Sequence, residues 1–294
     1  MTDLPAIRPG ADIGTSLAAI ARSAIADAAR EADGQSEAEL VHDVRKAMKR
    51  WRALLRLLDP FLGEEGVALR LQARDLARAL ATARDAQAAL DALGDLGDDY
   101  AALSPRSLAT VKARIDALRT SAEAATQTSG AHEKLRAALA QTADRVDHWP
   151  LAKVNFHDLA LSLTEGYRRA RTAIPDDWTH ASDEALHHLR QRVVVHRYQM
   201  EIIEPLWPRY GRVWVGEAQR LRDRLGEHQD LTVLSRLTSK HQPLARWRSR
   251  LQPAIAARQK DLIEAAMRHS GRLFAEKPRA FRRRLEGLWE ARAG

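Results

Sequence analysis

Apolar residues recur at intervals of three and four along nearly the whole chain, and this spacing constrains the fold more than any other feature. It places the apolar side chains on one face of an α-helix. Runs of β-branched residues are almost absent, and the main exception, Val193–Val195, lies inside a longer helical pattern. Together with the prolines, the spacing predicts an all-α protein with helices near residues 14–32, 36–59, 64–93, 105–126, 132–147, 151–173, 181–204, 209–239, 243–273 and 278–291.

A repeat with an offset of 145 residues runs through these predicted helices. The identical pairs that it aligns include His42 with His187, Arg45 with Arg190, Arg52 with Arg197, Pro60 with Pro205, Leu76 with Leu221, Leu80 with Leu225, and Asp85 with Asp230. One constant offset across two helices indicates internal duplication. The chain is therefore predicted to form two similar helical bundles in tandem, over residues 13–147 and 148–294, after a flexible tail at residues 1–12.

The charge of the chain favours a polyanionic partner. Lys and Arg number 47 against 39 Asp and Glu, which gives a net charge of +8. Most of these cations are Arg, whose planar guanidinium suits phosphate oxygens. The absence of Cys excludes disulfides, thiolate metal sites and cysteine nucleophiles. No apolar run approaches the roughly 18 residues of a membrane span and no signal peptide is recognisable, so we expect a cytoplasmic protein without membrane contact.

The stretch Val41–Pro60 separates its cations from its apolar residues. At about 100° per residue, six of its basic side chains fall within about 120° of one another, opposite Trp51 and several leucines. Between the first and last of them the single acid is Asp43. Solvated helix faces usually mix both signs of charge, so this row favours an anion-binding helix over a merely solvated one. The row consists of His42, Arg45, Lys46, Lys49, Arg52 and Arg56.

The second copy of this helix, Leu186–Pro205, carries fewer cations. It keeps His187, Arg190 and Arg197. Gln191, Val194 and Glu201 stand at the positions of Lys46, Lys49 and Arg56. Two such helices that face each other across a pseudo-twofold axis would line a positive groove between the bundles. Because the second copy has lost cations, we expect the first half to hold an anion more strongly.

Several motifs are similar to those of the CHAD domain, the conserved histidine α-helical domain, over nearly the whole chain. "VHDVRKAMKRWRALL" and "LHHLRQRVVVHRYQME" resemble its histidine helices. "LATARDAQAAL" and "LGEHQDLTVL" resemble its LG..RD segment, with Gln229 in place of Arg in the second copy. "GYRRARTAI" and "FAEKPRAFRRRLEGLW" are also similar to family features.

The resemblance implies two four-helix bundles related by pseudo-twofold symmetry, with a basic groove that binds inorganic polyphosphate. It also implies association with polyphosphate granules, and it implies that the protein is not an enzyme. Inorganic polyphosphate is thus the expected partner, with other polyanions as alternatives, and no cofactor or metal is expected. Polyphosphate lacks bases and sugars, so repeated cations would be enough to bind it. The predicted binding residues are His42, Arg45, Lys46, Lys49, Arg52, Arg56, Arg84, Arg168, Arg171, His187, Arg190, Arg197 and Lys277.

Two other functions remain open. A nucleic-acid-binding protein is compatible with the charge, but the sequence has no zinc-finger spacing or ribonucleoprotein motif, and aromatic residues make up only 5% of it. A polyphosphate-processing enzyme would normally need carboxylates clustered around a metal. The sequence has no phosphate-binding glycine loop. Its "EAE" at Glu37–Glu39 is predicted as the acidic first turn of a helix.

Overall fold

The computed structural model describes residues 5–32, 37–79, 82–96, 103–127 and 131–291. Its α-helices are α1 (Ile13–Ala32), α2 (Glu37–Ala79), α3 (Thr82–Asp95), α4 (Pro105–Gln127), α5 (Ala131–Val146), α6 (Phe156–Thr172), α7 (Asp183–Ile203), α8 (Pro208–Leu237), α9 (Arg248–Leu273) and α10 (Pro278–Glu290). Short 3₁₀ turns, η2 (Leu151–Lys153), η3 (Glu204–Leu206) and η4 (Ala245–Trp247), precede α6, α8 and α9. The predicted all-α class is confirmed.

Local chemistry sets several helix ends. Asn155 and Asp158 form a reciprocal capping box at the start of α6, with both hydrogen bonds at 3.1 Å. The Ser182 hydroxyl accepts from the N–H of Ala185 at the start of α7. The break expected after Pro60 occurs at Gly63, which has a φ of 56° and divides α2 into two helical segments.

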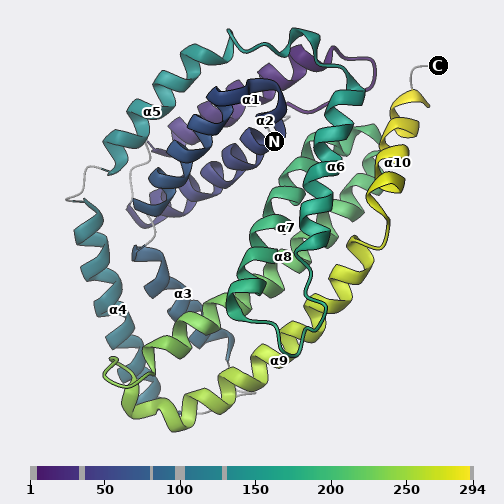
Figure 1. Ribbon diagram of the computed structural model, residues 1–294. Coiled ribbons are helices and arrows are strands. Elements are labelled where there is room, and N and C mark those ends of the chain that lie inside the picture. Colours follow the sequence, from purple (N-terminus) through teal and green to yellow (C-terminus); the bar gives the residue numbers. More distant parts are fainter. Residues whose placement is uncertain (1–4, 33–36, 80–81, 97–102, 128–130, 292–294) are drawn as a thin grey trace.

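The pairing of helices repeats between the two halves of the chain. In the first half α1 contacts α2 and α5, just as α6 contacts α7 and α10 in the second. Likewise α3 packs on α4, and α8 packs on α9. The halves meet where α2 contacts α7 and where α3 contacts α8 (Figure 1). The helices that carry the two histidine motifs are therefore in direct contact.

The apolar clusters cross the boundary between the halves. The larger cluster combines α1, α2 and α5 with α6, α7, α10 and the first part of α8. The smaller one combines α3 and α4 with the end of α8 and the start of α9. The division into two tandem four-helix bundles, at residues 13–147 and 148–294, stays a prediction.

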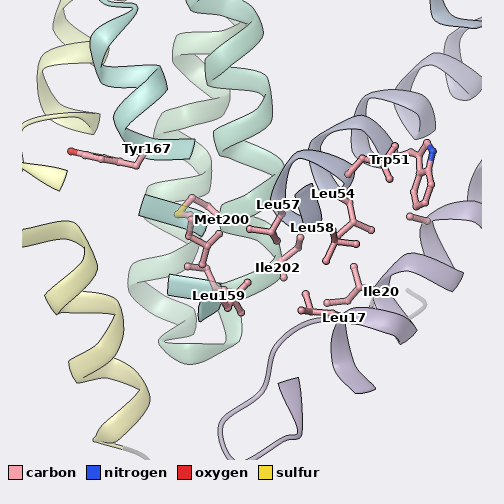
Figure 2. Close-up of a cluster of buried hydrophobic side chains, with 14 of the residues drawn as sticks. Leu17, Ile20, Trp51, Leu54, Leu57, Leu58, Leu159, Tyr167, Met200 and Ile202 are labelled. Atoms are coloured by element: carbon pink, nitrogen blue, oxygen red, sulfur yellow. The ribbon is translucent and has the colours of Figure 1, made fainter. Parts of the chain in front are cut away.

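The first segment of α2 lies at the centre of the larger cluster. Leu57 and Leu58 are fully buried and Leu54 is nearly so. Figure 2 shows Leu57 on the side of Met200 from α7, and Leu54 and Leu58 on the side of Leu17 from α1. Full burial stabilises a leucine side chain by roughly 1.5–3 kcal/mol. These contacts fix the rotation of α2 about its axis, and with it the direction of its cations.

Residues 5–12 do not form the loose tail predicted for residues 1–12. Ile7 is fully buried in the larger cluster, and its N–H donates to the carbonyl of Ile202 at 2.8 Å. Asp12 caps α1 by accepting from the N–H of Thr15 at 2.7 Å. The prediction failed because one large apolar residue in a short segment gives no periodicity. Residues 1–4 lie outside the described part of the chain.

Candidate anion-binding site

The row of cations on α2 runs from the surface into the protein. Lys46 is exposed, whereas Lys49, Arg52 and Arg56 are half-buried. The side chains of Ala53 and Leu57 leave the helix axis within about 60° of the direction of His42, on the cationic side. Both are fully buried. The side chains of His42, Arg45 and Arg84 lie outside the described residues.

Packing of α6 and α7 explains this burial. The side-chain amide of Gln199 on α7 donates to the carbonyl of Ala53 at 3.4 Å. The Ser162 hydroxyl on α6 donates to the carbonyl of Leu57 at 2.6 Å. Both neighbouring helices thus contact the backbone of α2 on its cationic side. The small side chain of Ala53 leaves room for this contact.

Arg56 is a half-buried cation without a carboxylate partner among the described residues. Its burial lowers the pKa of its guanidinium to about 10, and repulsion by other arginines, led by Arg192 and Arg52, adds to the effect. A desolvated charge without a counter-ion is costly. An anion bound beside Arg56 would remove that cost, so this position is the strongest electrostatic signal for a ligand.

Arg56, Arg169 and Arg192 come from α2, α6 and α7 and line one pocket of about 50 Å³. Burial lowers the pKa of Arg192, and repulsion by Arg169 contributes. Two carboxylates also line the pocket, those of Asp59 and Glu165. Because no single helix supplies more than one of the three arginines, the cluster exists only in the folded chain.

Each of the two carboxylates in the pocket is already paired with an arginine. Asp59 pairs with Arg70 at 3.0 Å. Glu165 pairs with both Arg168, at 2.7 Å, and Arg169, at 2.6 Å. The hydrogen bond from Arg168 is the first cause that lowers the pKa of Glu165 to about 2. Glu165 is therefore ionised at neutral pH, and it shares its charge between two guanidinium groups.

A larger cavity of about 420 Å³ lies where α3, α7 and α8 meet. His187 lines it together with Asp85 and Gln229, so residues from the histidine helix and from both RD-like segments come together there. Asp183, Glu184, His188, Gln191 and Arg236 also contribute. The described lining mixes acids with bases, so a uniformly basic groove stays a proposal.

Glycine at position 226 makes room for Arg190. A Cβ on Gly226 would lie 3.2 Å from the terminal nitrogen Nη2 of Arg190. The Arg190 side chain thus lies flat against α8, at the LG motif of the second half. This contact gives a physical reason for the glycine of that motif: a larger residue would push the guanidinium away from the helix.

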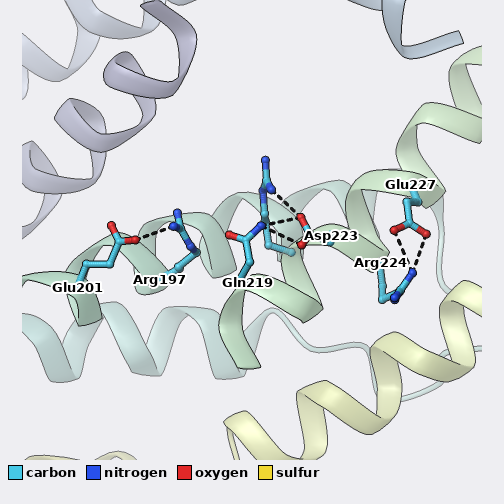
Figure 3. Close-up of polar contacts among 7 residues, drawn as sticks. Arg197, Glu201, Gln219, Asp223, Arg224 and Glu227 are labelled. Carbon is cyan, nitrogen blue, oxygen red and sulfur yellow. Dashed lines mark hydrogen bonds and ion pairs between the residues drawn. The ribbon is translucent and has the colours of Figure 1, made fainter. Parts of the chain in front are cut away.

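Arg197 is neutralised by the protein itself. Its guanidinium pairs with Glu201 at 2.5 Å, as Figure 3 shows, and lies 4.6 Å from the ring centre of Tyr198. Arg50 approaches the same carboxylate at 3.9 Å. Burial raises the pKa of Glu201, against the effect of Arg197 and Arg50. An anion would have to compete with Glu201 for these cations.

Three further predicted residues lie toward the end of α6 and the start of α10. Arg168 is exposed and is held by Glu165. Arg171 donates from Nε to the carbonyl of Phe274 at 3.1 Å, which ties α6 to the end of α9. Lys277 is exposed and caps α10 through its backbone. None of the three lines the arginine pocket, and their role as ligand contacts stays a prediction.

Within the described residues, no group of three or more His, Asp or Glu side chains is arranged to hold a metal ion. In the same part of the chain, no helix is both long enough and apolar enough to cross a membrane.

The comparisons with known proteins agree on the family. A family model described as the CHAD domain matches residues 19–239. The chain belongs to the CHAD domain family. Among solved structures it is similar to PptA from Streptomyces chartreusis, with 19% identity, a TM-score of 0.65, and coverage of 90% of this chain and 100% of that one. It is also similar to the CHAD domain from the plant Ricinus communis, with 20% identity, a TM-score of 0.58, and coverage of 97% and 95%. No curated protein matches.

Two arginines of the pocket in this CHAD domain were missed by sequence reasoning, Arg169 and Arg192. The repeat did not mark them, because alanines stand 145 residues before both. A weaker signal does exist for Arg169. It follows Gly166 by three residues and Ser162 by seven, so the three lie on the same face of the helix. Because Ser162 and Gly166 are small, another helix can approach this face closely.

Proposed function

We propose that this chain binds inorganic polyphosphate along the cationic side of α2 and the adjoining side of α7, without catalysis. The observation that carries the proposal is Arg56, a half-buried cation among other arginines with no described carboxylate partner. Membership of the CHAD family supports a phosphate polymer as the anion. The first half supplies more of the binding energy, since Glu201 already neutralises Arg197 in the second.

The chemistry of the site suits a phosphate chain. Guanidinium groups form forked, charge-assisted hydrogen bonds to phosphate oxygens. Lys46, Lys49, Arg52 and Arg56 follow one another at intervals of three or four residues, which is about one cation per helical turn. A polymer with about one charge per phosphate can follow such a row. Binding would release counter-ions, so affinity should fall steeply with salt, by analogy with nucleic acids.

The test is a calorimetric titration with long-chain polyphosphate at about 150 mM salt. We expect saturable binding that weakens at least tenfold in a double variant, Arg52→Ala with Arg56→Ala. The matched control is Arg106→Ala, an exposed arginine on α4. Absence of binding by the wild-type chain, or equal loss in the control, would contradict the proposal.

Two added measurements separate the alternative functions. If the chain is a nucleic-acid-binding protein, RNA at equal charge concentration will displace polyphosphate; we expect polyphosphate to win. If the chain is an enzyme, phosphate will be released from long-chain polyphosphate when Mg²⁺ is added; we expect none. Association with polyphosphate granules follows from the same proposal, and a fluorescent fusion should lose it when Arg52 and Arg56 are replaced.

A further inference from the structure

The arginine pocket between α2, α6 and α7 differs from an open basic row in size. Its volume of about 50 Å³ is several times the roughly 10–15 Å³ that one water molecule needs. That corresponds to three to five water-sized volumes, which suits the four oxygens of one tetrahedral oxyanion. It is far too small for a run of several phosphates.

The walls of the pocket supply guanidinium groups from three directions. Arg56 has no described carboxylate partner. Arg192 donates from Nε to Nε2 of His188 at 3.4 Å, and Glu165 attracts its charge without a described ion pair. Arg169 is the single one of the three bound to a carboxylate, that of Glu165. Three forks around one small space match a tetrahedral group with at least three non-bridging oxygens better than an internal phosphate of a chain, which has only two.

Gln199 lines the pocket and carries a buried acceptor that lacks a donor among the described residues. Gln199 is 1% exposed, and its side-chain oxygen Oε1 has no hydrogen-bond partner among the described residues. The same oxygen lies over Gly166, where a Cβ would come within 2.3 Å of it. Gly166 also lines the pocket. A buried acceptor without a donor is uncommon in folded proteins and calls for an explanation.

A phosphoryl group with a hydroxyl would satisfy all of these side chains at once. Its charged oxygens would accept from the guanidinium groups, and its P–OH would donate to Oε1 of Gln199. Near neutral pH, inorganic phosphate always carries at least one hydroxyl, and a terminal phosphoryl group, with a second pKa near 6, carries one part of the time. The internal phosphates of a chain carry none.

We propose that this pocket binds one hydroxyl-bearing tetrahedral phosphoryl group, either inorganic phosphate or the terminal group of a polyphosphate chain. The second source rests on the proposed polyphosphate binding, whereas the first does not. In the chain-end case the pocket anchors one end of the polymer, and the row of cations on α2 binds the part that follows.

The first experiment compares inorganic phosphate with sulfate by calorimetry at pH 7. Sulfate has the same shape but no proton to donate, so it would leave Oε1 facing another acceptor. We expect one phosphate per chain, bound about tenfold more tightly than sulfate. Gln199→Met should remove this preference. Equal affinity for the two anions in the wild-type chain would refute the role of Gln199.

Arg192→Lys is the second variant, and it does not disturb the buried Gln199. It keeps the charge but removes the fork, so phosphate affinity should fall at least tenfold. Arg106→Lys, on α4, is the matched control and should change nothing. If phosphate does not bind saturably, or if Arg192→Lys binds it as tightly as the wild type, the pocket is not its site.

A third experiment tests whether the pocket binds the end of a polyphosphate chain. It compares the affinity for polyphosphate with free ends with that for polyphosphate whose ends are blocked as phosphoramidates. The wild-type chain should bind the free-ended polymer at least threefold more tightly, and Arg192→Lys should abolish that difference. Equal binding of both polymers would refute anchoring of the chain end while leaving polyphosphate binding intact. Failure of both polymers to bind would refute the proposed function instead.

Discussion

Replacement of Arg56 by methionine should stabilise the ligand-free protein. The pKa of Arg56 falls from 12.5 to about 10 in the folded chain, which at about 1.36 kcal/mol per unit corresponds to roughly 3 kcal/mol against its charged form. Solvent screens part of this cost because the side chain is only half-buried, so we take about 1–2 kcal/mol. Methionine keeps the aliphatic packing and removes the charge.

The sign of the effect follows from linkage. The folded state binds the Arg56 proton more weakly than the unfolded state does, so this group lowers stability at neutral pH and stops doing so only as pH rises from about 10 toward 12.5. At neutral pH, Arg56→Met should therefore raise the melting temperature by roughly 2–6 °C at low salt. The gain should shrink in 1 M salt, where the screening length is about 3 Å.

Differential scanning calorimetry with and without polyphosphate checks both halves of this reasoning. Polyphosphate should raise the melting temperature of the wild-type chain and change that of Arg56→Met much less. Arg106→Met, exposed on α4, controls for general charge effects. A variant that melts below the wild type at low salt would show that Arg56 has a stabilising partner, and the argument for an anion beside it would then fail.

Three other substitutions test separate parts of the structure. Burial holds the pKa of His196 near 3, below its unfolded value, so stability should fall as pH drops from about 6.5 toward 3; urea titrations should show a shallower fall for His196→Gln. Glu201→Gln should free Arg197 and increase polyphosphate affinity roughly threefold to tenfold at low salt, as measured by titration. Gly14→Ala should cost about 1–3 kcal/mol in denaturant unfolding, because its Cβ would lie 2.2 Å from a backbone oxygen. The matched control Gly94→Ala has open space and should stabilise by up to about 1 kcal/mol.

The sequence predicted several helices closely because their signals are local, although the single helix expected at residues 64–93 corresponds to the second segment of α2 and to α3. The expected stretches at residues 105–126 and 278–291 correspond to α4 and α10 within one residue at each end. Prolines and capping residues act on neighbouring backbone groups, so they can be found without a tertiary structure. The 145-residue repeat predicts that α2 and α7 are equivalent helices, and the structure shows that they touch.

The arginine pocket could not be predicted in the same way. The helical wheel of α2 separated cations from apolar residues, but it could not show that α7 covers Ala53 on the cationic side. Arg56 is buried in the same region, beside residues of α6 and α7. Arg169 and Arg192 belong to other helices and lie far away in the sequence, so only packing of α6 and α7 onto α2 brings them to the same place.

The two halves of the repeat differ in how their buried cations are neutralised. Position 56 holds an arginine in the first half, and the equivalent position 201 holds a glutamate in the second. In the second half Glu201 neutralises Arg197 and approaches Arg50, so the charge is balanced without a ligand. In the first half Arg56 has no described counter-ion, and its cost can be offset only by an anion from outside. A chain with two balanced halves would gain little from phosphate, whereas one unbalanced half would gain from the phosphate binding that we propose.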